Sequence, residues 1–209
     1  MGFTDKTTTN DELYLFTQDD AAMMLNTSSS LATTNDSVST LETKANIITL
    51  TANEYDSTNT AGATYSQIEY IDNLTNIPVF KFVSSSEQHV QRIINNKTNT
   101  IPSNTFNVTF NVLVSGSGAL TDSTTIFSCK SKFIEKGISV DNVFGTEYSC
   151  SIDVTEYNTI YTGSIESVII SGSYVNDNYF VIDIARKYND INEDLADYSY
   201  LVSTELTFV

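Results

Sequence analysis

Residues 106–114 read Phe-Asn-Val-Thr-Phe-Asn-Val-Leu-Val, and this stretch decides the fold class. Apolar and polar side chains alternate from Phe106 to Val112, so one face of the segment would be buried and the other would meet solvent. A period of two residues is that of a β-strand. The stretch therefore predicts a strand of an antiparallel sheet.

Similar runs extend in both directions from this strand. They cover residues 77–83, 124–134, 147–154, 158–170, 179–184 and 198–208. Turn-forming residues separate them, at Gly116, Gly118, Gly137, Gly145, Gly163 and the hairpin 175–178. Roughly seven to nine short strands over residues 77–209 predict an antiparallel β-sandwich, with a jelly-roll-like arrangement. Residues 87–94 fit either a helix or a strand.

The composition favours an all-β protein. The 209 residues include 12 Tyr and 11 Phe, and 40% of the chain is hydrophobic, which is not the composition of a disordered chain. Ser, Thr and Asn make up roughly a third of the chain, well above their usual share. Thr, Val, Ile, Tyr and Phe suit a pleated, half-buried surface.

The charge excludes several functions. The chain carries 10 Lys+Arg against 26 Asp+Glu, a formal net charge of −16. A surface this acidic repels nucleic acid and anionic membranes, so we expect neither as a partner. No stretch approaches the ~20 apolar residues that span a bilayer, so membrane insertion is not expected. The opening residues show no signal peptide.

Upstream of the predicted sandwich, residues 31–56 show heptad spacing. The positions are Leu31, Thr34, Val38, Leu41, Ala45, Ile48, Ala52 and Tyr55. So narrow an apolar seam needs a partner helix, which predicts a short coiled-coil stalk that forms on oligomerisation. An ordinary amphipathic helix of a monomer and an extended Thr-rich fibrous segment are the alternatives. Residues 57–64 have the composition of a linker, and residues 65–74 are expected to form one or two helical turns. Together with the heptad segment they make up a stalk-and-linker region of residues 31–76.

The first 30 residues are polar apart from two short apolar clusters. These contain Leu13, Tyr14, Leu15 and Phe16, and Met23, Met24 and Leu25. Such a segment predicts either a short buried helix or an anchor that docks on a partner, to which Met side chains adapt well.

Residues that carry chemistry are scarce. His89 is the single histidine, and no metal-binding, nucleophile-elbow or phosphate-loop motif is present. We expect His89 at the surface or in a subunit contact, and Cys129 and Cys150 reduced, with a disulfide as the alternative. Residues 190–194 begin like an EF-hand loop, but Leu195 stands where that loop needs glycine. The sequence predicts no enzyme, no metal and no cofactor.

Two sets of residues suggest contact with sugars. Tyrosines crowd the last third of the chain and could form a stacking platform or simply pack in the core; they are Tyr157, Tyr161, Tyr174, Tyr179, Tyr188, Tyr198 and Tyr200. A glycan-cleaving carboxylate pair could come from Glu147, Asp153, Glu156 and Glu166, but the sequence brings no two of them together.

The order of anchor, Thr/Ser-rich heptad stalk and β-sandwich resembles a bacteriophage fibre, and at this length a head fibre or capsid-decoration protein. That resemblance implies a homotrimer in the virion, assembled in the host cytoplasm. Its N-terminal segment would bind the capsid, and its outward tip would contact host glycans or stabilise the particle. The alternative, of a different class, is a monomeric carbohydrate-binding β-sandwich module.

Overall fold

The computed structural model describes residues 46–58, 62–70, 75–96, 101–117, 119–135, 137, 143–172 and 178–209. The expected anchor residues Leu13, Tyr14, Leu15, Phe16, Met23, Met24 and Leu25 lie outside the described residues, as do the stalk residues Leu31, Val38, Leu41 and Ala45.

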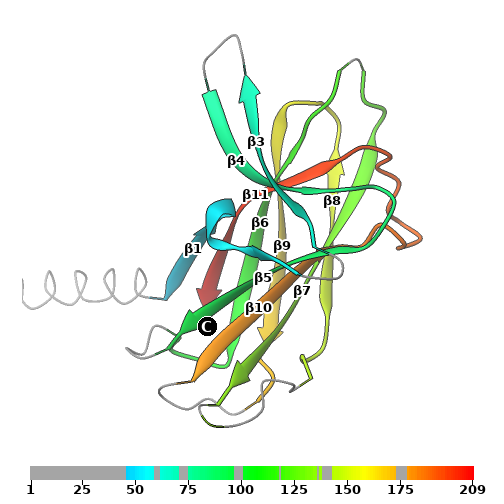
Figure 1. Cartoon of the computed structure of the whole chain (residues 1–209). Coiled ribbons are helices and arrows are strands. Elements are labelled where there is room, and N and C mark those ends of the chain that lie inside the picture. Colours follow the sequence, from blue (N-terminus) through cyan, green and yellow to red (C-terminus); the bar gives the residue numbers. More distant parts are fainter. Residues whose placement is uncertain are drawn as a thin grey trace, which may run out of the picture. The chain divides into compact units, whose positions relative to one another are not determined.

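The described chain folds into two antiparallel sheets, which confirms the predicted mainly-β, sandwich-like class (Figure 1). The first, the β6 sheet, has the order β3-β4-β11-β6-β9, and β1 also pairs with β11. Its strands are β1 (Ile47–Thr51), β3 (Thr64–Tyr70), β4 (Thr75–Phe82), β6 (Thr105–Val114), β9 (Thr159–Ile169) and β11 (Ser199–Phe208). The second, the β10 sheet, has the order β2-β5-β10-β7-β8. Its strands are β2 (Asp56–Ser57), β5 (Gln88–Asn95), β7 (Ser123–Ile134), β8 (Tyr148–Val154) and β10 (Tyr179–Arg186).

The alternating stretch that predicted a strand is β6, and its apolar side chains form part of the core. Phe106, Val108, Phe110 and Val112 are all 0% exposed. Aromatic contacts join the two sheets: the ring of Phe106 lies 5.7 Å from that of Phe180 in an edge-to-face arrangement. Burial of each such side chain contributes about 1.5–3 kcal/mol, so the alternation in sequence supplies much of the stability.

Arg186 brings a positive charge into this core. Its side chain is 0% exposed, and Nη2 donates to Glu193 Oε1 at 2.6 Å. Further donor groups bind the carbonyl oxygens of Leu195, at 2.6 Å, and Asp197, at 2.7 Å. These bonds fasten the loop after β10 to the end of that strand.

The helix predicted for residues 31–56 is wrong from residue 46 onward. Residues 47–51 form β1, and a short 3-10 helix, η1 (Ala52–Glu54), follows. β1 is rich in β-branched residues, and it pairs with β11, with Ile48 opposite Leu206. The heptad positions Ile48, Ala52 and Tyr55 do face apolar surroundings, but these belong to the sandwich core and not to a partner helix.

The sandwich therefore begins well before the predicted boundary at residue 77. The helical turns expected within 65–74 are also wrong for the part that the structure describes, because Tyr65 and Ile68 lie in β3. β3 pairs antiparallel with β4, with Ile68 opposite Ile77, and so extends the β6 sheet. Residues 87–94, which fitted either class, belong mostly to β5.

Candidate functional site

The outer face of the β10 sheet carries a group of polar side chains that are bonded to one another. Along β10, Phe180, Ile182 and Ile184 point into the core, so Tyr179, Val181, Asp183 and Ala185 point outward. The strand register then fixes their neighbours on that face. Gln91 of β5 and Lys130 of β7 lie on either side of Asp183, while His89 and Ser128 lie on either side of Ala185.

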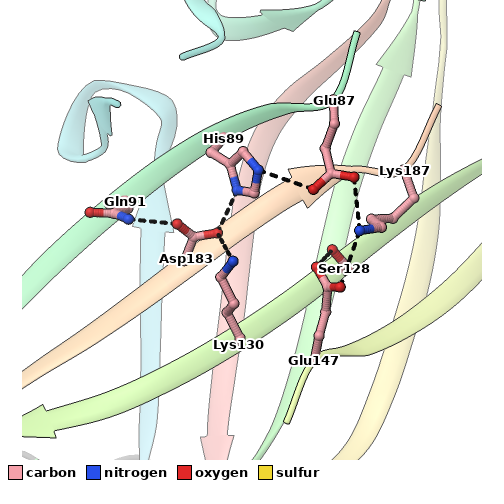
Figure 2. Close-up of polar contacts among 8 residues, drawn as sticks. All are labelled: Glu87, His89, Gln91, Ser128, Lys130, Glu147, Asp183 and Lys187. Carbon is pink, nitrogen blue, oxygen red and sulfur yellow. Dashed lines mark hydrogen bonds and ion pairs between the residues drawn. The ribbon is translucent and has the colours of Figure 1, made fainter. Parts of the chain in front are cut away.

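Asp183 is the centre of this group (Figure 2). Its side chain is only 4% exposed, although it points outward. Oδ1 accepts a hydrogen bond from His89 Nδ1 at 2.7 Å, and Oδ2 accepts one from Gln91 Nε2 at 2.6 Å. Lys130 Nζ lies 3.8 Å from Oδ1. A carboxylate with so little solvent needs such donors, and they hold it in one orientation.

His89 lies between two carboxylates. Its Nδ1 faces Asp183, and its Nε2 lies 3.1 Å from Glu87 Oε1. Both ring nitrogens can donate only when the imidazole is protonated. The hydrogen bond to Asp183 accordingly raises the pKa of His89 above its ordinary value, although partial burial opposes the shift.

Raising the pH is expected to remove the stability that protonated His89 supplies. The folded pKa lies above the ordinary value of 6.5, so this contribution is fully present below pH 6.5 and is lost as the pH rises through the folded pKa. His89→Asn keeps a donor for Asp183 but cannot be protonated. Urea denaturation between pH 5.5 and pH 9 (roughly one unit below to 2.5 units above that value) should show wild type more stable at the acidic end, with the difference shrinking toward the alkaline end. A difference that is the same at every pH would contradict this assignment.

A second set of ion pairs crosses the same face beside Ala185. Lys187 Nζ lies 2.8 Å from Glu87 Oε2 and 3.1 Å from Glu147 Oε2. Ser128 Oγ donates to Glu147 Oε1 at 2.8 Å. Partial burial would raise the pKa of Glu147, but the bonds from Ser128 and Lys187 outweigh it and the pKa is lowered. Glu147 is thus held as a carboxylate, and Lys187 connects it to Glu87, which precedes β5 on the other side of β10.

The other end of the face is more apolar. Tyr179 is 38% exposed and Ile93 is 54% exposed. Val181 lies between Ile93 and Lys132 in the register. The ammonium group of Lys132 lies 4.5 Å from the centre of the Phe144 ring, a cation–π contact. Tyr179 and Ile93 therefore present a small exposed apolar area at this end of the face, whereas Val181 is only 2% exposed.

The polar side chains on this face are bonded to one another. Both ring nitrogens of His89 face carboxylates, and the hydroxyl of Ser128 donates to Glu147. Ser128 and His89 therefore do not form a nucleophile–base pair. Within the described ranges, no group of three or more His, Cys, Asp or Glu side chains could hold a metal ion. Gln91 uses its Nε2 for Asp183, and nothing in the described chain donates to its Oε1.

The residues singled out from the sequence are scattered over the fold. The hydroxyl of Tyr157 donates to Asp197, and the hydroxyl of Tyr161 accepts from the backbone of Glu156, so both serve local structure. Of the four acids, Glu166 lies on β9 in the β6 sheet, whereas Glu147 and Asp153 belong to the β8 region of the other sheet. Tyr174 lies outside the described residues.

The remaining residues singled out from the sequence have structural roles or no role that the structure shows. Cys129 and Cys150 are free thiols, and burial raises the pKa of Cys150 to about 11. In the EF-hand-like loop, Glu193 pairs with Arg186 and is not available to a cation. The described residues contain no helix long and apolar enough to cross a membrane.

Sequence reasoning missed Asp183, Gln91, Lys130 and Lys187. A signal for Asp183 was present, because it is the acidic residue in the apolar run Val-Ile-Asp-Ile at 181–184. A charge inside such a run indicates either a buried ion pair or an outward-facing functional group.

The chain is only distantly similar to known proteins. No family model matches the sequence, and no curated protein matches it. Among solved structures, the chain is similar to the C-terminal family 22 carbohydrate-binding module of Clostridium thermocellum Xyn10B, with 14% identity, a TM-score of 0.43, and 77% of this chain and 92% of that one covered. It is also similar to the CBM22-2 xylan-binding domain of Paenibacillus barcinonensis Xyn10C, with 9% identity, a TM-score of 0.42, and 78% and 99% coverage. A family 11 module from the C. thermocellum cellulase Lic26A-Cel5E has 13% identity, a TM-score of 0.38, and 75% and 88% coverage.

Proposed function

We propose that the sandwich is a non-catalytic carbohydrate-binding module and that it binds a neutral glycan on the outer face of the β10 sheet. The observation that carries this proposal is that an apolar area and a row of polar side chains lie side by side on this face. Tyr179 and Ile93 form an exposed apolar area around the buried Val181, and Gln91, Asp183 and Lys130 form the next row of the same face.

Sugars have a matching pair of surfaces. The C–H groups of a pyranose ring pack on an aromatic face, while its hydroxyls need donors and acceptors at fixed positions. Tyr179 supplies an exposed ring, and the Oε1 of Gln91 and the ammonium of Lys130 supply an acceptor and a donor. Asp183 positions both side chains, so little conformational freedom is lost when a ligand binds.

The charge favours a neutral glycan over an acidic one. The protein carries a net charge of −16, and Glu87, Glu147 and Asp183 lie on the binding face itself. Polyuronates and sulfated glycans would be repelled by this field. A glycan array is therefore expected to show binding to neutral polysaccharides and none to acidic ones.

Replacing Tyr179 with alanine is expected to weaken glycan binding roughly tenfold, because a stacked ring contributes on the order of 1.5 kcal/mol. Titration calorimetry with the best neutral oligosaccharide from the array would measure the change. Tyr198→Ala is the matched control, because Tyr198 is 42% exposed but lies next to β11 in the other sheet. Equal losses in the two variants, or no loss in Tyr179→Ala, would contradict the placement of the site.

Gln91→Ala tests the polar row separately. It is expected to weaken binding to a similar extent, since it removes the acceptor Oε1 and one of the donors that orient Asp183. His89 and Lys130 still face Asp183 in this variant, so the free energy of unfolding should fall by no more than the loss of one hydrogen bond to a charged group, about 1.5–3 kcal/mol.

The phage-fibre resemblance gains no support from the described residues, because the second half of its stalk lies in the sandwich. Trimerisation and attachment to a capsid through residues 1–30 stay predictions. Light scattering on the full-length chain tests them. A mass near 23.1 kDa favours the single module, and three times that mass favours the fibre.

A further inference from the structure

A polar cavity lies at one end of the sandwich, between the loop that follows β6 and the loop that joins β8 to β9 (Figure 1). Its volume is about 540 Å³, within the usual range of small-ligand sites. Its lining residues include Ser117 and Leu120 from the first loop, and Glu156, Tyr157 and Asn158 from the second.

This cavity is separate from the proposed glycan face. Tyr179 pairs with Ile134 at the far end of β7, whereas the first loop leads into β7 at Ser123. The length of β7, roughly 35 Å at the usual rise per residue, lies between them. The cavity and the glycan face share no described residue.

Hydrogen bonds between the two loops fix the shape of the cavity. Asn158 has a left-handed backbone, with φ of 58°, and donates its N–H to the carbonyl oxygen of Val114 at 2.7 Å. Its side chain accepts from Ser115 Oγ at 3.3 Å and donates to the carbonyl oxygen of Gly116 at 3.4 Å. The second loop is thus fastened to the first at three points, so a ligand would not have to order the loops when it binds.

The ring of Tyr157 is a rigid wall of the cavity. Its hydroxyl donates to Asp197. Gly116 lies so close that a Cβ at this position would come within 2.5 Å of the ring, an approach that only glycine permits. The backbone beside the ring is held as well, because the hydroxyl of Tyr161 accepts the N–H of Glu156 at 2.6 Å.

Three polar groups at the cavity still have bonding capacity. The hydroxyl of Ser117 and the carboxylate of Glu156 bind no other residue in the described part of the chain. The Nδ2 group of Asn158 uses one of its two hydrogens for Gly116, so the second remains available. The cavity therefore offers a donor and acceptors together, beside an aromatic ring.

We infer that this cavity binds a neutral sugar. Sugar hydroxyls both donate and accept, and the C–H groups of the ring pack on an aromatic side chain. An anion would be repelled by Glu156, and no Lys or Arg is among the described lining residues. An ammonium group would leave the Asn158 donor unpaired, and an apolar ligand would desolvate all three polar groups. The inference rests on the proposed function for its ligand class, but it adds a second site.

The probes for the first test are the methyl glycosides of glucose, galactose and mannose, with ethylammonium as the cationic comparison. Amide NMR titration of the full chain should show shift changes at residues 116–117, 119–120 and 155–158 for at least one glycoside, with a millimolar dissociation constant. Ethylammonium should bind at least about tenfold more weakly, because it leaves a donor unpaired. No shift changes at these residues with all three glycosides would overturn the inference. Equal or tighter binding of ethylammonium would also overturn it.

Tyr179→Ala separates this inference from the proposed function. The variant removes the exposed ring of the β10 face, so sugar-induced shifts on that face should be lost while those at the loops remain. Shifts confined to the β10 face in wild type would support the proposed function and contradict the second site. Shifts confined to the loops would support the second site and contradict the proposed face. Loss of the loop shifts in Tyr179→Ala would overturn the inference, because the loops would then only report binding at the face.

Two substitutions test the contacts within the cavity. Ser117→Ala and Glu156→Gln are each expected to weaken glycoside binding by about three- to tenfold, the usual cost of losing or weakening one hydrogen bond. The matched control is Glu205→Gln, which removes one negative charge from an exposed side chain of β11. Equal weakening by Glu205→Gln and Glu156→Gln would assign the effect to net charge and contradict a contact at Glu156. No loss in either cavity variant would overturn the inference.

Discussion

Replacing Arg186 with alanine is expected to lower the free energy of unfolding by about 3–5 kcal/mol, the usual cost of breaking a buried ion pair. Arg186 is fully buried, and its loss takes away the donors to Glu193 Oε1 and to the carbonyl oxygens of Leu195 and Asp197. Urea denaturation at pH 7 would measure the change. The largest local effect should fall on the loop after β10, which these bonds fasten.

Lys187→Ala is the matched control for Arg186. It removes the next cation in the chain, whose side chain is 23% exposed and bridges Glu87 and Glu147. Partly exposed pairs of this kind contribute at most about 1 kcal/mol. Equal destabilisation by the two variants would show that the buried pair has no special role.

The pH dependence of the Arg186→Ala variant separates charge from packing. Burial already raises the pKa of Glu193, with Arg186 opposing the shift, so removal of the arginine raises that pKa further. Near pH 5 the carboxyl can take up a proton and the penalty falls. The difference from wild type should therefore be smaller at pH 5 than at pH 7. A second variant, Arg186→Met with Glu193→Gln, should recover much of the loss, because it removes both charges.

Phe180→Ala is expected to destabilise the protein by about 3–5 kcal/mol, the range for large-to-small changes in a packed core. Phe180 is 0% exposed, and its ring contacts those of Phe106, Phe133 and Phe208 at centre distances of 5.7, 6.0 and 6.0 Å. The cavity would open between both sheets, where neighbouring rings cannot close it. Thermal or urea unfolding would measure the loss.

The neighbouring residue provides the control. Tyr179 lies next to Phe180 in β10 but points outward, so Tyr179→Ala should change stability by less than about 1 kcal/mol. The two adjacent variants thus separate folding from binding. Phe180→Ala should lose stability, and Tyr179→Ala should lose the glycan. Strong destabilisation by Tyr179→Ala would show that the face of β10 has been assigned wrongly.

The sequence predicted the β-sandwich because long strands such as β6 contain enough inward positions to reveal a period of two. β1 has only two core-facing residues, Ile48 and Leu50, which are too few to establish a period. Ile48, together with Ala52 and Tyr55, fell by coincidence on heptad spacing. Pairing with β11, about 150 residues away, decides the conformation of this segment, and a local pattern carries no record of such a partner.

The proposed glycan site was predictable only in part. Exposed tyrosines in the last third of the chain suggested a sugar platform, and Tyr179 is one of them. His89 and Asp183 lie 94 residues apart in the chain, and they meet only because of the register between β5 and β10. A shift of one residue in that register would turn His89 toward the core. No local signal in the sequence fixes such a register.

The pairing of β1 with β11 also has a mechanical consequence. Ile47 lies opposite Thr207, and Phe208 donates its N–H to the carbonyl oxygen of Asn46 at 2.8 Å, so residues 46 and 209 leave the sheet at the same end. A force that pulls these two points apart would load the rungs of the β1–β11 ladder in succession, as in opening a zipper. Strands loaded in this way separate at far lower force than strands sheared along their length. Tension between residue 46 and the end of β11 would therefore peel β1 away first and leave the outer face of the β10 sheet in place.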